Sequence, residues 1–252
     1  MNESQLRQQL AAISASIWER GWVANHDGNL SARLPRKRLM CTPTAVSKRE
    51  IRPNDMLVLD ETGKHMSGKG KPFSEINLHL AFFHARADVG AVLHAHPPTA
   101  TALGVSGNAS LERPFLPEAV VSIGPMVPTV PVAMPGIEAV QALAPYLDEY
   151  DALLLAGNGV ITAGVDMEMA FLRMELVEHL ANIALAAQQL GGPTPLPPRF
   201  LEQLLAARAR AGLGPEARGG ATTKPQAEAS PRETRDLDRV VRQEIERVLR
   251  RR

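Results

Sequence analysis

The sequence of 252 residues has a single cysteine, Cys41, few aromatic residues and almost no net charge. One cysteine excludes an internal disulfide framework and agrees with a reducing compartment. Aromatic residues make up 4%, so aliphatic and alanine-rich packing must fill the core. Lys and Arg number 28 against 27 Asp and Glu, which leaves no overall field to attract nucleic acid or an anionic membrane.

Long hydrophobic runs are also missing. No stretch approaches the roughly 18 to 20 apolar residues that a membrane-spanning helix needs. The start of the chain places polar residues such as Glu3 and Arg7 before any apolar run, which is unlike a secretory signal. We therefore expect a cytoplasmic protein with neither nucleic acid nor membrane as a partner. Its length and its 44% of apolar residues suit one sizeable α/β domain with appendages.

Helical and strand patterns alternate along the first three quarters of the chain. Apolar residues at helical spacing predict helices over residues 4–19, 72–84 and 166–190. Short apolar runs predict strands over residues 39–41, 56–59, 89–93, 152–155 and 160–162, and the Pro-rich stretch 125–135 predicts further strands and connections. This interleaving indicates an α/β fold, although it does not separate parallel from antiparallel sheets.

The composition changes after Gly191. A Pro-rich connector is followed by a predicted helix over residues 200–211, and residues 212–229, rich in Gly, Pro, Ala and Thr, indicate a flexible linker. Ser230, Pro231 and Glu233 then form a helix-start signature ahead of an apolar stripe flanked by Arg and Glu. The predicted organisation is a catalytic domain over residues 1–211, a linker over 212–229 and an amphipathic helix over 230–252.

Two histidines and one glutamate carry the strongest chemical signal. His94 and His96 lie two residues apart at the end of a predicted strand, so both side chains project from the same face and two imidazoles could converge on one divalent cation. Glu75 opens the preceding predicted helix, where a carboxylate can serve as a general base or as a further ligand.

Five separated motifs together resemble the class II aldolase and epimerase family. They occur in family order over roughly residues 5–205, and they are Gly28-Asn29-Leu30-Ser31-Ala32-Arg33, Thr42-Pro43-Thr44, Lys71-Pro72-Phe73-Ser74-Glu75 with His79, Ala91-Val92-Leu93-His94-Ala95-His96-Pro97, and residues 155–164. The resemblance implies a three-layer α/β/α fold with a central, mostly antiparallel sheet. It also implies a homotetramer with active sites between subunits.

The resemblance assigns roles to individual residues. His94 and His96 would hold Zn²⁺ or another divalent cation such as Mn²⁺ or Mg²⁺, with Asn158 at the third ligand position, and Glu75 would be the catalytic acid/base. The residues implied for the phosphate or other terminal group of the substrate are Gly28, Asn29, Thr44, Ala45 and Ser74.

Two departures from the family pattern bear on the function. Asn158 stands in the Gly157-Asn158-Gly159 turn where the family has a third metal-binding histidine, and an amide oxygen is a poor substitute for imidazole on zinc. Glu75 is an alternative third ligand and His179 a remote one. The anion loops read Thr44-Ala45 and Phe73-Ser74 where the family favours Ser-Gly and Ser-Ser.

The leading hypothesis is a metal-dependent aldolase, a carbon-carbon lyase that cleaves a sugar phosphate such as fuculose- or rhamnulose-1-phosphate to dihydroxyacetone phosphate and an aldehyde. The alternatives are a sugar-phosphate epimerase or a hydroxy- or keto-acid decarboxylase on the same scaffold, and a non-catalytic cargo or binding protein with a decayed site. The linker and C-terminal helix resemble the peptides that direct cargo to the shell proteins of bacterial microcompartments. Packing of this helix on its own tetramer is an equal alternative, and its arginines leave membrane-surface binding as a less favoured third.

Overall fold

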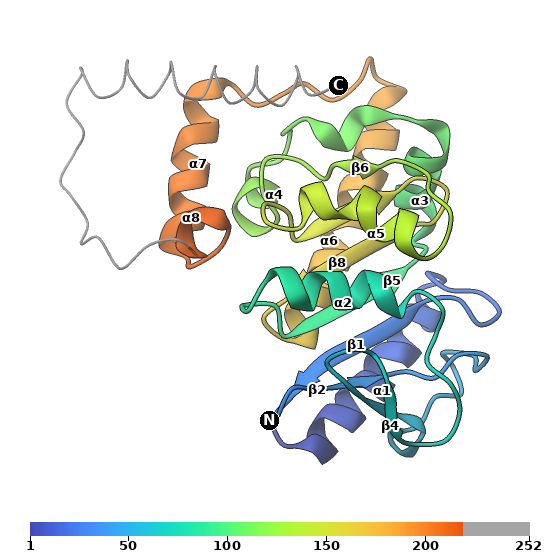
Figure 1. Cartoon of the computed structure of the whole chain (residues 1–252). Helices are drawn as coiled ribbons and strands as arrows, with labels where there is room; N and C mark the ends of the chain where they lie inside the picture. Colours follow the sequence, from blue (N-terminus) through green and yellow to red (C-terminus); the bar gives the residue numbers. More distant parts are fainter. Residues whose placement is uncertain (219–252) are drawn as a thin grey trace.

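The structure, a computed structural model, describes residues 1–218 of the chain, which form a single mixed sheet covered by helices on both faces (Figure 1). The helices are α1 (Glu3–Glu19), α2 (Ile76–Ala85), α3 (Pro98–Ser106), α4 (Pro117–Ser122), α5 (Ile137–Leu143), α6 (Met167–Gln188), α7 (Pro198–Arg210) and α8 (Pro215–Arg218), with short 3-10 helices η1 (Pro53–Asp55), η2 (Ala109–Glu112) and η3 (Ala144–Tyr146). The strands are β1 (Asn29–Leu34), β2 (Arg38–Cys41), β3 (Leu57–Asp60), β4 (His65–Ser67), β5 (Ala91–Ala95), β6 (Thr129–Val130), β7 (Ala152–Leu155) and β8 (Val160–Gly164).

The sheet has the strand order β4-β3-β2-β1-β5-β8-β7-β6. Neighbouring strands are antiparallel throughout, except for the parallel pair β6–β7. The α/β class and the mostly antiparallel central sheet are therefore confirmed. None of the helices in the described part of the chain combines the length and apolar character that crossing a bilayer requires.

Two hydrophobic cores lie on opposite faces of the sheet and make three layers. One core joins the sheet to α1, α3, α4 and α6, and the other joins it to α2 and α5. Strand alternation explains the division, because in β5 the side chain of Leu93 belongs to the first core and that of Val92 to the second. The α/β/α arrangement expected from the family resemblance is thus present.

Local sequence explains where the long helices begin. The side chain of Asn2 accepts a hydrogen bond from the Gln5 amide at the start of α1, and Asp166 does the same for the Met169 amide at the start of α6. Each cap satisfies an amide that has no partner within the helix. The predicted helices over residues 4–19 and 166–190 agree with α1 and α6 to within two residues at each end.

Part of the segment predicted as a linker is helical in the structure. Residues 212–218, assigned to a flexible linker, include α8, which packs beside α7 (Figure 1). The Arg218 side chain there pairs with the carboxylates of Asp88, at 3.2 Å, and of Asp151, at 2.7 Å. These long-range ion pairs fix a segment whose composition alone gives no reason for order. The rest of the predicted linker, 219–229, and the predicted helix 230–252 lie outside the described residues.

Candidate active site

The two histidines of the site come from β5 and from the residue that follows it. His94 pairs with Asn29 of β1 and with Ile161 of β8 in the sheet, so it lies in the centre of the strand order. The Nε2 atoms of His94 and His96 are 3.2 Å apart. Two nitrogens bound to one tetrahedral zinc at 2.0–2.1 Å would lie about 3.3 Å apart, so the rings have the separation that a shared ion needs.

The other ring nitrogen of each histidine faces an oxygen. Nδ1 of His94 lies 2.9 Å from the carbonyl oxygen of Val160, which can only accept, so Nδ1 carries the proton and Nε2 presents its lone pair. Nδ1 of His96 faces the Asp27 carboxylate at 3.7 Å. Burial lowers the pKa of His94, which keeps the imidazole neutral and available as a ligand. Oxygen partners of this kind orient metal-binding histidines in proteins.

Glu75 lies at the N-cap of α2, beside the imidazoles, and two amides hold its carboxylate. Asn29 donates to Oε2 at 2.9 Å and Asn158 donates to Oε1 at 2.6 Å, while Oε2 lies 3.5 Å from Nε2 of His94. Burial alone would raise the pKa of Glu75, but the hydrogen bonds donated by the two amides help to lower it below its usual value. The carboxylate is therefore ionised at neutral pH and fixed in orientation.

The donor set fits a divalent cation in part. Among residues 1–218, no three His, Cys, Asp or Glu side chains form a group with metal-binding geometry. The two imidazoles are suited to an ion, and Asn158 can offer its amide oxygen because its nitrogen is used by Glu75. An oxygen in place of a third imidazole makes a weaker zinc site than three histidines would.

The residues expected to bind the anionic group fall into two sets. Asn29 belongs to the cluster around Glu75, and a side chain at Gly28 would meet Val23 and the His94 carbonyl oxygen. Thr44, Ala45 and Ser74 are exposed on two adjoining loops that are joined by the bond from the Thr44 amide to the Lys71 oxygen and by the Pro43–Pro72 bridge. No hydrogen bond within the described residues joins this second set to Glu75 or to the histidines.

His79 and Lys48 are buried residues near the site to which no role was assigned from sequence. His79, quoted only as part of a motif, is completely buried, and its Nδ1 lies 2.7 Å from the Ser31 hydroxyl. The β1 residues Asn29 and Ser31 and the α2 residues Glu75 and His79 thus pair in two parallel rungs, because two residues of a strand span about the same length as four residues of a helix. Lys48 was missed entirely, since nothing in its local sequence distinguishes it from a surface lysine.

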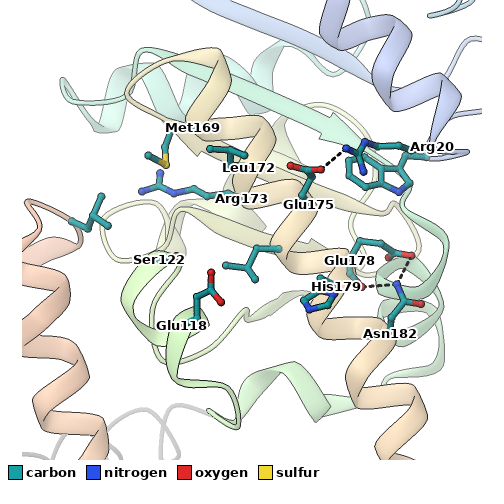
Figure 2. Close-up of a pocket in the computed structure, with 13 residues that line it drawn as sticks. Arg20, Glu118, Ser122, Met169, Leu172, Arg173, Glu175, Glu178, His179 and Asn182 are labelled. Atoms are coloured by element: carbon teal, nitrogen blue, oxygen red, sulfur yellow. Dashed lines mark hydrogen bonds and ion pairs between the residues drawn. The ribbon is translucent and has the colours of Figure 1, made fainter.

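A groove of about 830 Å³ lies elsewhere, along the outer side of α6 (Figure 2). Its lining includes Arg20, Glu118 and Glu175, but not His94, His96, Glu75 or Asn158. His179, the remote candidate for a third ligand, is exposed in this groove and so belongs to a different surface from the paired imidazoles.

Comparison with known proteins identifies the family of this chain. The sequence is 33% identical over 185 residues to 3-oxo-tetronate 4-phosphate decarboxylase of Escherichia coli strain K12, covering 72% of this chain and 86% of that protein. It is 32% identical over 174 residues to methylthioribulose-1-phosphate dehydratase of Methylococcus capsulatus, covering 65% and 85%. A solved structure of L-fuculose 1-phosphate aldolase superposes with a TM-score of 0.73 at 26% identity, covering 82% of this chain and 97% of that one. The model of the Class II Aldolase and Adducin N-terminal domain matches residues 8–185, and the chain belongs to the class II aldolase family.

Proposed function

We propose that the protein is a metal-dependent lyase that breaks the carbon–carbon bond beside the carbonyl of a phosphorylated substrate, and that its reaction is the decarboxylation of a phosphorylated 3-oxo acid. The observation that carries the proposal is the pair of imidazole nitrogens 3.2 Å apart, beside a carboxylate fixed by two amides. The sequence likeness to a 3-oxo-tetronate 4-phosphate decarboxylase supports the choice of reaction. Decarboxylation was an alternative from sequence, and it replaces aldol cleavage as the leading proposal.

The residues divide the chemistry between them. His94, His96 and the Asn158 oxygen would hold a divalent cation, Zn²⁺ or Mn²⁺ or Mg²⁺, which supplies a Lewis acid for the substrate carbonyl when bound. Glu75, which is ionised before substrate binds, would relay a proton from water to the substrate carbon as CO₂ leaves. Gly28, Asn29, Thr44, Ala45 and Ser74 would bind the phosphate through amides and hydroxyls.

Aldol cleavage is the second candidate, and the state of Glu75 favours it. Cleavage of a sugar phosphate begins with removal of a hydroxyl proton, which requires a base, and the lowered pKa of Glu75 makes its carboxylate available as one. The solved structure of L-fuculose 1-phosphate aldolase has the same fold. Epimerisation would begin with a similar cleavage, but the two fragments would then rejoin to form a single product.

One experiment separates these possibilities from a decayed site. The purified protein is analysed for bound metal and is then incubated with 3-oxo-tetronate 4-phosphate and, separately, with fuculose 1-phosphate, while released CO₂ and released aldehyde are measured. We expect about one ion per chain and CO₂ release, both lost in His94→Ala and His96→Ala. Turnover by metal-free protein would contradict the proposal, and absence of both metal and turnover would favour a binding protein.

The oligomeric state and the cellular location of the protein stay predictions. We propose a homotetramer, as the family resemblance implies, and a place in the cytoplasm, as the single cysteine and the polar start of the sequence suggest. Association with microcompartment shell proteins depends on residues 230–252, which lie outside the described residues.

A further inference from the structure

Lys48 is a lysine that is only 1% exposed, close to the candidate site. Lysines are almost never fully buried, because removal of an ammonium group from water costs several kcal/mol unless other groups compensate. Burial lowers the pKa of Lys48 to about 8, and the nearby Asp27 carboxylate opposes that effect. The groups that the buried ammonium group contacts therefore indicate what Lys48 does.

The contacts of Lys48 join two loops. Its Nζ donates to the carbonyl oxygens of His26 and Val46, each at 3.2 Å. His26 lies in the loop that leads through Gly28 to Asn29, and Val46 directly follows Thr44-Ala45. The two loops that would bind the substrate phosphate are therefore tied to one buried cation.

Both loops contain a residue in the left-handed backbone region. Gly28 has φ +73° and Ala45 has φ +59°. The conformation is natural for glycine, whereas in a residue with a Cβ it costs about 1–2 kcal/mol. Ala45 keeps this conformation only while its surroundings hold it, and the bond from Lys48 to the next carbonyl is one of the contacts that do so.

We propose that Lys48 is a positioning residue for substrate binding, which fixes the Gly28–Asn29 loop and the Thr44–Ala45 loop at the separation at which both can bind one phosphate group. The inference rests on the proposed function, because it takes the phosphate of the substrate as the group that these loops bind. Lys48 acts through the carbonyl groups of His26 and Val46 and not on the reacting atoms. Its loss should weaken binding of the anion and leave the metal and Glu75 in place.

The test compares Lys48→Met, which keeps most of the length of the side chain without its charge, with Lys37→Met. Lys37 is exposed and pairs with Glu61, away from both loops. The dissociation constant of inorganic phosphate is measured by calorimetry, together with KM, kcat and metal content. We expect Lys48→Met to raise the phosphate dissociation constant and KM by about ten- to hundredfold, with kcat and metal content near those of wild type. Lys37→Met should match wild type throughout.

A second variant covers the case in which Lys48→Met does not fold. Lys48→Ala removes three carbons and the ammonium group, and added propylammonium ion supplies the same atoms. Recovery of phosphate affinity with propylammonium supports the proposal, since a role in stability alone would change the amount of folded protein and not the affinity of the folded fraction. Phosphate affinity equal to wild type in both variants, or no phosphate binding by wild type, would overturn it. If wild type turns over no substrate while the variants still lose phosphate affinity, the proposed function fails and the role of Lys48 stands.

Discussion

Gly159 shows how one residue can fix the place of a candidate ligand. It has φ +74°, and a Cβ there would lie 2.4 Å from the Ala95 oxygen and 2.5 Å from Cδ2 of His96. Gly157, two residues earlier in the same turn, also has φ +74°, but its nearest neighbour would be Cγ2 of Val132 at 3.9 Å. A substitution at Gly157 therefore tests backbone strain alone, whereas a substitution at Gly159 also displaces the imidazole of His96.

We expect Gly159→Ala to displace His96 and to lower kcat/KM by about a hundredfold or more, because small misplacements of reacting groups have effects of that size. Gly157→Ala should lose only about 1–2 kcal/mol of stability from its left-handed backbone. Steady-state kinetics and metal content of the two variants check this. Equal activity in both would show that the position of His96 does not depend on the close approach at Gly159.

His79 should make the stability of the protein depend on pH in the acid range. Burial lowers the pKa of this imidazole to about 3, whereas in the unfolded chain it stays near 6.5. Between these values the unfolded chain takes up a proton that the folded chain does not, so stability is complete above pH 6.5 and falls as the pH drops toward 3.

The variant His79→Asn has no imidazole to take up a proton at this position, so it should lack the part of the pH dependence of stability that His79 causes. Between pH 7 and pH 4.5 the free energy of unfolding of wild type should fall by about 3 kcal/mol more than that of the variant. Urea denaturation at the two pH values gives the comparison, and His84→Asn, an exposed position on the same helix, is the control. Parallel pH profiles for wild type and His79→Asn would mean that the imidazole takes up its proton as readily in the folded protein as in the unfolded chain.

At the scale of elements, one buried carboxylate joins four of them. Asp151, immediately before β7, is fully buried and pairs with four arginines at 2.7 to 3.0 Å. They are Arg86 after α2, Arg173 of α6, Arg208 of α7 and Arg218 of α8. The C-terminal helices are thus linked by ion pairs to the residue before β7.

Asp151→Asn should destabilise the protein by about 3–5 kcal/mol, because it leaves buried guanidinium groups without their counter-charge. Asp148→Asn is a matched control, since Asp148 is exposed and offers Arg218 only its backbone oxygen. Thermal and urea unfolding measure the difference between them. A loss below about 1 kcal/mol for Asp151→Asn would place this cluster with ordinary surface ion pairs.

For the whole molecule, the sequence predicted those parts of the fold that have a local pattern. Apolar periodicity located α1, α6 and the strands β2, β3 and β7, and the motif order led to the family. The short helices α3, α4 and α5 were not predicted, since each has too few residues for an apolar pattern to repeat. Strand β4 was missed because all three of its residues are exposed and show no alternation.

The candidate site was likewise predicted where the sequence has a local pattern and missed where it has none. The i and i+2 spacing was enough to expect His94 and His96 on one side of a strand, and the structure brings their rings together. The role of Lys48 and the cluster at Asp151 could not be predicted, because they depend on partners distant in the chain. Lys48 bonds to His26, and Arg86 reaches Asp151 from another layer of the fold.

The pairing of Asn29 with His94 across β1 and β5 has a consequence for which length changes the gene tolerates. Side chains alternate between the two faces of a strand, so the loss or gain of one residue inside β1 would turn Asn29 and Ser31 away from α2 and into the opposite core. Insertions in the exposed turn at residues 61–64 would leave that alternation unchanged. In-frame insertion scanning should therefore find β1 intolerant at every position and this turn permissive.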